Sequence, residues 1–159
     1  MNVFGLMETS GSAMQAERMR AEVVAANMAN AETTRTESGG PYRRQHVVFA
    51  ANSSADFADS LAGASRIPAG LPVSMGTNTR QPAGGVHIAQ VVQDPAPPLK
   101  RYDPGHPDAG PDGYVAYPDI NPLTEMVDLM GATRAYGLNG SAVQAEKGMI
   151  AAALEIVKS

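Results

Sequence analysis

A chain of 159 residues is long enough for one ordinary domain, or for one small domain with helical extensions. Its net charge is -4, only 18% of its residues are charged and its largest basic cluster is Arg43 with Arg44, which argues against nucleic-acid binding. The absence of cysteine excludes disulfides, thiolate catalysis and cysteine-ligated zinc.

Residues 3 to 31 are predicted to form the first long helix, roughly 40 Å in length at 1.5 Å per residue. Mostly apolar or small residues recur every seven positions in two rows, while the charged residues point elsewhere. The first row consists of Met7, Met14, Ala21 and Met28, and the second of Val3, Ser10, Val24 and Ala31. We expect these rows to pack against another helix.

The N-terminal segment does not resemble a secretion signal. Charged residues such as Glu8, Glu17 and Arg18 interrupt it, so it has no basic start followed by an apolar core. The chain also lacks any run of 18 apolar residues. We therefore expect no direct membrane insertion and, if the protein leaves the cytoplasm, a route without a cleaved signal.

The middle of the chain is predicted to consist of strands, turns and loops, because all twelve prolines lie between Pro41 and Pro122. Four stretches have the residue pattern of a strand, and they follow glycines or are separated by turn residues. They are residues 42–50, 86–92, 99–102 and 113–117. Residues 51–82 are rich in Ala, Ser, Gly and Asn, and we expect them to form a long surface excursion.

A second long helix is predicted from Asn121 or Pro122 to the C-terminus. Asn121 can accept hydrogen bonds from the free amides of the first turn, Pro122 suits the first helical position, and Glu125 places negative charge near the positive end. A seven-residue row follows the helix, with a second row beside it. The first row is Leu129, Tyr136, Val143, Ile150 and Val157, and the second contains Met126, Thr133, Gly140 and Leu154.

Four glycines weaken this helix, since each costs about 1 kcal/mol of helical preference relative to alanine. They are Gly131, Gly137, Gly140 and Gly148. Burial of apolar side chains along the seven-residue row would return about 1.5 to 3 kcal/mol apiece, which exceeds the loss only when a partner covers the row. Helix formation here is therefore expected to depend on a partner, and the glycines would let a neighbouring backbone approach closely.

These elements predict an α+β fold in which the terminal helices form an antiparallel coiled coil that carries a small, irregular, β-rich middle segment. The expected divisions are an N-terminal helix at 1–35, a strand- and loop-rich outer segment at 36–120, and a C-terminal helix at 121–159. The simplest interpretation of both rows is the core of a helical hairpin, and an interaction with other molecules is the alternative.

No credible active site is evident. The best candidate places His106 two residues before Asp108, but a metal site needs three or four ligands in fixed geometry, and turn chemistry explains the segment more simply. No nucleophile arrangement and no phosphate-binding loop are present. We therefore expect no catalytic residue, no metal and no cofactor, and a small metal-dependent enzyme is the remote alternative.

Two short patterns at the helices carry a resemblance. Residues 24–33 resemble the N-terminal signature of bacterial flagellar rod and hook proteins, in which two asparagines three apart close the first helix. Nine residues near the start of the second helix resemble the matching C-terminal signature of that family. They are Asn121, Glu125, Met126, Val127, Met130, Arg134, Ala135, Tyr136 and Asn139. Residues 39–45, 102–108 and 113–115 are similar to one member of that family, a proximal-rod component.

The resemblance implies a non-enzymatic subunit of the flagellar basal body, exported through the flagellar type III apparatus and polymerised in the periplasm around the export channel. Its implied partners are copies of itself, other rod proteins, and the membrane-ring and rod-adaptor proteins. Another rod or hook component is the alternative within the family. Asn27 and Asn30 would either end the first helix or touch a neighbouring subunit, and Arg134 would either form an ion pair or stay exposed.

The residues expected to form the assembly interface are drawn from both terminal helices. They are Met7, Met14, Ala21, Val24, Asn27, Met28, Asn30, Met126, Leu129, Arg134, Tyr136, Val143, Ile150, Leu154 and Val157.

Overall fold

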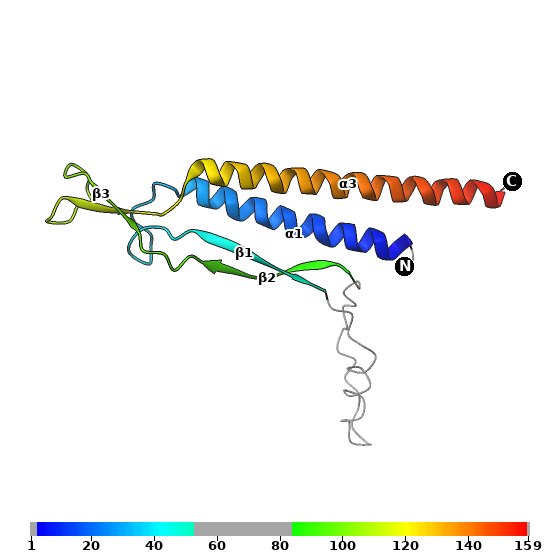
Figure 1. Cartoon of the computed structure of the whole chain (residues 1–159), viewed down its shortest axis with the longest axis horizontal. Helices are drawn as coiled ribbons and strands as arrows, with labels where there is room; N and C mark the ends of the chain where they lie inside the picture. The colour runs from blue at the N-terminus through cyan, green and yellow to red at the C-terminus, as the bar shows by residue number, and fades with distance from the viewer. Residues whose placement is uncertain (1–2, 53–83, 159) are drawn as a thin grey trace, which may run out of the picture.

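Two long helices lie side by side and run in opposite directions in the computed structural model, which describes residues 3–52 and 84–158 (Figure 1). Helix α1 spans Val3–Ala29 and helix α3 spans Pro122–Lys158. The N- and C-termini lie at the same end of the molecule, where α3 extends past α1 (Figure 1). The predicted α+β fold with an antiparallel helix pair is confirmed, while the knobs-into-holes packing of a coiled coil stays a prediction.

The ends of both helices follow from their sequences. The Asn121 side-chain oxygen accepts a hydrogen bond from the Leu123 amide at 3.0 Å, and Pro122 takes the first helical position, as predicted. Helix α1 ends at Ala29, two residues earlier than predicted. Asn30 caps this end of the helix. Its backbone nitrogen and its side-chain nitrogen both donate a hydrogen bond to the Ala26 carbonyl.

The middle segment contains two separate two-stranded antiparallel sheets. Strands β1 (Gln45–Ala51) and β2 (Val86–Gln93) form one, and β3 (Leu99–Tyr102) and β4 (Tyr114–Tyr117) form the other. All four strands were predicted, but β1 begins three residues late because the Tyr42 amide bonds to the Thr33 carbonyl rather than to a strand. Apart from its first two residues, the predicted excursion at 51–82 lies outside the described residues.

The β1–β2 ribbon lies along α1, on a different side of that helix from α3 (Figure 1). Two polar contacts fix its two ends. The Val86 amide donates to the Ser12 hydroxyl at 3.1 Å, and the Asn27 side chain bonds to the backbone of Gln45. These anchors are 15 residues apart on α1, or roughly 22 Å, which matches the length of a seven-residue strand.

The most deeply buried row of α3 was not predicted, whereas the predicted first row is half-buried at Leu129, Val143 and Ile150. Glu125, Ala132 and Glu146 are buried and Asn139 is half-buried, again at intervals of seven. The predicted second row is wrong as an internal seam, because Met126 is 51% exposed and Leu154 58% exposed. The reason is steric: the side chain of Ala132 is small enough to let α1 approach closely, so the helix is rotated toward this row.

Candidate functional site

Asn27 joins three elements at the point where α1, β1 and α3 meet. Its side-chain nitrogen donates to the Gln45 carbonyl at 2.9 Å and to Glu125 Oε2 at 3.1 Å. Its side-chain oxygen accepts from the Gln45 amide at 2.9 Å and from the Tyr42 hydroxyl at 3.2 Å. All four hydrogen-bonding positions of the amide are therefore used within the chain, as expected of a side chain that is only 1% exposed.

Glu125 is the second member of this junction and is equally buried. Arg44 donates from Nε to Glu125 Oε1 at 2.7 Å, so the carboxylate is neutralised by a cation from the loop before β1. Asp128, one turn further along α3, pairs with Arg20 of α1 at 3.3 Å. The two carboxylates and two guanidinium groups balance, which is how charges become tolerable in a partly buried site.

Tyr42 is the third member of this junction, and its hydroxyl donates the hydrogen bond to Asn27. Burial, and secondarily the negative charge of Glu125, raise the pKa of its phenol above the ordinary value. The phenol therefore stays protonated and keeps its proton on the hydrogen bond to Asn27. We call Asn27, Tyr42, Arg44 and Glu125 the polar junction; it locks the end of α1 to the start of α3.

The His106 and Asp108 segment is a turn, as the structural interpretation predicted. The Asp108 amide donates to His106 Nδ1 at 3.1 Å, and the Asp108 carboxylate accepts from the Thr34 hydroxyl at 2.8 Å. Within residues 3–52 and 84–158, no group of three His, Asp or Glu side chains could hold a metal ion. The pair instead connects the turn between β3 and β4 to the loop after α1.

The predicted interface residues of α1 are covered to different degrees in the single chain. Met7, Met14, Ala21 and Met28 are half-buried, as is Asn30 at the helix end. Val24 and Asn27 are buried. Whether the half-buried methionines also touch a neighbouring subunit stays a prediction.

The predicted interface residues of α3 divide into two groups. Those half-buried in the single chain are Leu129, Val143 and Ile150. Those exposed are Met126, Arg134, Tyr136 and Leu154, and the side chain of Val157 lies outside the described part. Arg134 has no ion-pair partner among the described residues, so its ion pair stays a prediction.

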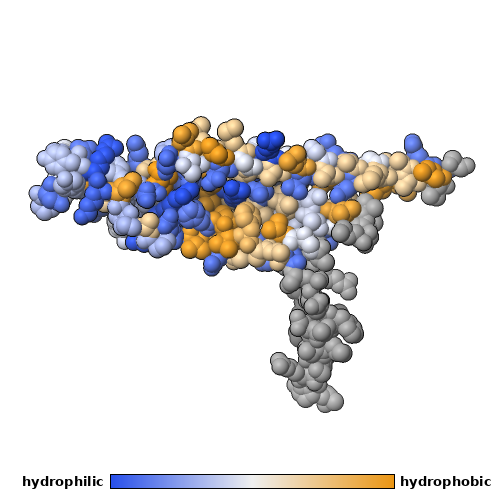
Figure 2. Space-filling view, viewed as in Figure 1, coloured by the Kyte–Doolittle hydropathy of each residue, from blue (hydrophilic) through white to orange (hydrophobic). Residues whose placement is uncertain are grey.

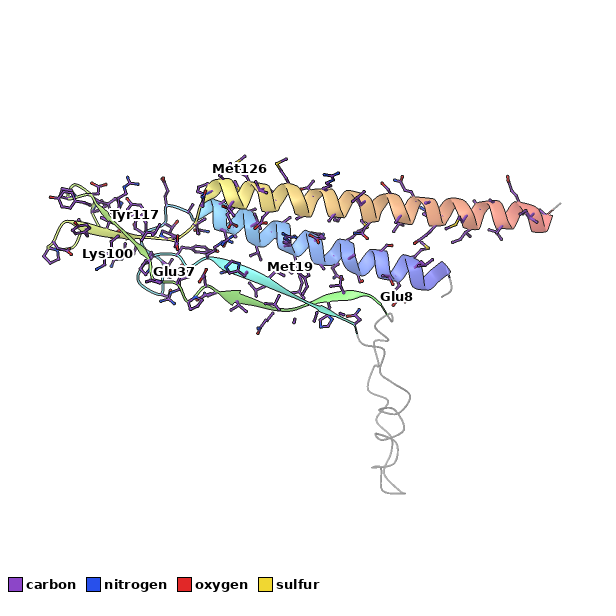
Figure 3. All side chains as sticks on the ribbon, viewed as in Figure 1. Glu8, Met19, Glu37, Lys100, Tyr117 and Met126 are labelled. Atoms are coloured by element: carbon purple, nitrogen blue, oxygen red, sulfur yellow. The ribbon has the colours of Figure 1, made fainter. Side chains whose placement is uncertain are left out.

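The first half of α3 carries an apolar surface, which we call the outer patch and of which the predicted interface included only Met126. It consists of Leu123, Met126, Val127 and Met130, which are 51 to 70% exposed. Figure 3 shows Met126 on the side of α3 that faces away from α1. Its spacing of three and four residues is the signal of one helix face, whereas the predicted interface followed rows with a seven-residue spacing.

The four glycines of α3 face open space as well. Apart from the helix's own backbone, a methyl group added at Gly131, Gly137, Gly140 or Gly148 would meet no atom of the described residues within 4 Å. Packing within the described part of the chain therefore does not require these glycines, although each weakens the helix. Hydrophobic and weakly polar residues continue along the visible face of α3, whereas hydrophilic residues gather at the β3–β4 end (Figure 2).

The fold and this surface define an elongated structural subunit with a locked junction at one end and uncovered helix surface along α3. No helix in the described part of the chain has the length and apolar character needed to cross a bilayer. Comparisons with known proteins agree with this class. Residues 7–35 match the family model for flagella basal body rod protein, and residues 112–156 match that for the flagellar basal body rod FlgEFG protein C-terminal.

Relatives match nearly the whole chain. The flagellar basal-body rod protein FlgC of Borreliella burgdorferi is 34% identical over 99% of both chains, and that of Bacillus subtilis is 36% identical over 99% of this chain and 100% of its own. FlgC of Salmonella typhimurium is 32% identical over 94% of each. The chain therefore belongs to the FlgC family of flagellar basal-body rod proteins. It is a structural subunit of the basal-body rod and not an enzyme, so the metal-dependent alternative is set aside.

Proposed function

We propose that this subunit occupies the proximal rod, where α1 and α3 pack with neighbouring subunits into a tube around the export channel and transmit torque to the distal rod and hook. The exposed apolar surface of α3 carries this proposal. A soluble monomer has little reason to expose Leu123, Val127 and Met130 together on one helix. Burial against a neighbour would stabilise the assembly by about 1.5 kcal/mol or more for each side chain.

The glycines and the lack of charge support close packing in such a tube. Between residues 129 and 145, Arg134 is the only charged residue. A neighbouring helix could therefore approach Gly131 or Gly137 without desolvating a charge at each turn. The half-buried methionines of α1 can adapt to non-identical neighbours because their side chains are flexible.

The same weak helices suit export. The chain would pass through the flagellar type III apparatus unfolded, without a cleaved signal, and α3 would become fully helical on arrival in the periplasm. Its partners would be copies of itself, other rod proteins, and the membrane-ring and rod-adaptor proteins. The divisions at 1–35, 36–120 and 121–159 would then separate the inner helices from an outer segment.

Location in purified basal bodies tests this proposal. An antibody label on the β3–β4 end is expected at the membrane-proximal part of the rod, and deletion of the gene is expected to leave cells without a rod beyond that level. A label on the distal rod or the hook would instead support the alternative position within the family, and its absence from basal bodies would refute both.

A further inference from the structure

The C-terminal end of α3 has no part of α1 opposite it. The contact of Asn27 with Glu125 aligns the end of α1 with the start of α3, and α1 has 27 residues whereas α3 has 37. About ten residues of α3 therefore extend beyond α1. Figure 1 shows α3 passing the end of α1. We call residues 149–158 the overhang; its Met149 is 55% exposed and its Leu154 is 58% exposed.

The overhang continues the face that α1 covers elsewhere. Val143 is half-buried in the helix pair, Ile150 is half-buried at the start of the overhang, and Leu154 follows one turn after Ile150. From residue 149 to residue 154 the sequence carries no charge. The apolar face of α3 thus extends past the end of α1. A helix of another subunit has room to pack on this part of α3.

The outer patch at the start of α3 cannot meet the overhang of the same molecule. Met126 and Leu154 are 28 residues apart on one continuous helix, or about 42 Å. Within residues 3–52 and 84–158, neither surface is covered, and the two lie at opposite ends of α3, so each can pack against another subunit. A contact between unlike surfaces can repeat along an open filament, as a rod requires.

The helix ends favour the same pairing. The overhang is the C-terminal end of α3, which carries partial negative charge, and the outer patch is beside the N-terminal end, which carries partial positive charge. Because residues 112–156 match the C-terminal model of other rod proteins, a neighbouring rod subunit carries a corresponding helix. That helix would present its start to the overhang in the same orientation.

We propose that the overhang packs on the start of the C-terminal helix of the next rod subunit of this family, over the segment corresponding to residues 123–130. This inference rests on the proposed function and adds the surface and the direction of the contact. Subunits would join head to tail, with the apolar side chains of the overhang against the outer patch of the neighbour.

A photoreactive phenylalanine derivative at Leu154, incorporated by stop-codon suppression, tests the contact in assembled flagella. The matched control places it at Ala152, an exposed residue that lies about 200° around the helix from Leu154. After illumination, purified basal bodies are digested and the cross-linked peptides are identified. We expect the Leu154 probe to cross-link to the start of the C-terminal helix of a rod subunit, at least about fivefold more than the Ala152 probe.

Three results would contradict the proposed contact between the overhang and the outer patch of the neighbouring subunit. Cross-links of the Leu154 probe that map to another element, or equal yields from both positions, would overturn the head-to-tail contact. So would the absence of any adduct in basal bodies that contain the substituted chain. In these cases the proposed position in the rod stands. If the unsubstituted chain is itself missing from basal bodies, the proposed function fails and this inference fails with it.

Discussion

Asn27 of α1 donates a hydrogen bond to Glu125 of α3 at 3.1 Å, and both side chains are only 1% exposed. The contact spans 98 positions of the sequence and fixes the two helices in register. Because the same amide also binds the backbone of Gln45, the register of β1 depends on it too. This one side chain therefore orients the helix pair and the outer ribbon relative to each other.

Replacement of Asn27 should destabilise the protein strongly. Asn27→Ala leaves the Gln45 backbone groups and Glu125 Oε2 without their partners, so the free energy of unfolding should fall by about 2 to 4 kcal/mol. Urea unfolding followed by circular dichroism measures this. Asn30→Ala is the control, since water can replace its bond to Ala26, and its cost should stay under about 1 kcal/mol. Equal costs for both variants would contradict the role of the junction.

The Arg44–Glu125 pair should behave as a buried ion pair. Arg44→Met leaves a buried carboxylate unpaired, which should cost about 3 kcal/mol or more. Adding Glu125→Gln removes the charge, and the double variant should recover at least half of that loss. Thermal unfolding of both variants, with the exposed Arg43→Met as control, checks this. A double variant no more stable than Arg44→Met alone would show that the charge is not the cause.

The sequence predicted the local elements of this fold well and its long-range contacts poorly. The start of α3 at Pro122 and the positions of all four strands follow from capping, proline and turn residues, which act over a few positions. The polar junction brings together Asn27, Arg44 and Glu125 from three separate elements. Glu125 was interpreted only as a charge near the helix start, and nothing local in the sequence indicates that an arginine 81 positions earlier neutralises it.

The rotation of α3 was unpredictable for a related reason. Hydrophobic periodicity locates rows of large apolar residues, whereas the buried row of α3 holds Glu125, Ala132, Asn139 and Glu146. A small residue such as Ala132, or a hydrogen-bonded one such as Glu125, can pack in a helix interface without giving any hydrophobic signal. The apolar residues that periodicity did locate are partly exposed in the single chain, which is why they remain candidates for contacts between subunits.

Stability at alkaline pH should depend on Tyr42. Its folded pKa is raised, so its contribution is fully present below the ordinary phenol pKa of about 10 and is lost as the pH rises through the folded pKa. The free energy of unfolding of the wild type should therefore fall more steeply above pH 10 than that of Tyr42→Phe. Tyr136→Phe, on the exposed side of α3, should keep the wild-type slope. Parallel curves for Tyr42→Phe and wild type would refute this.

The outer patch should matter for assembly and not for the stability of the monomer. Met130 is 70% exposed, so Met130→Asp should change the free energy of unfolding by less than about 0.5 kcal/mol. Against a neighbouring helix the unpaired carboxylate would cost several kcal/mol, and cells should export the variant but fail to swim. Met130→Leu keeps the apolar surface and should swim. Normal swimming of Met130→Asp cells would argue against the interface.

The burial of the outer face of α3 between rod subunits can be measured directly. Because the chain contains no cysteine, a thiol introduced as Met130→Cys is the only one in the chain. Its rate of reaction with a water-soluble maleimide is compared between the dilute monomer and purified basal bodies. If the outer face of α3 is buried between rod subunits, the thiol should react rapidly in the monomer and at least about tenfold more slowly in the rod. Equal rates in both states would show that this face remains open to solvent and would contradict the account.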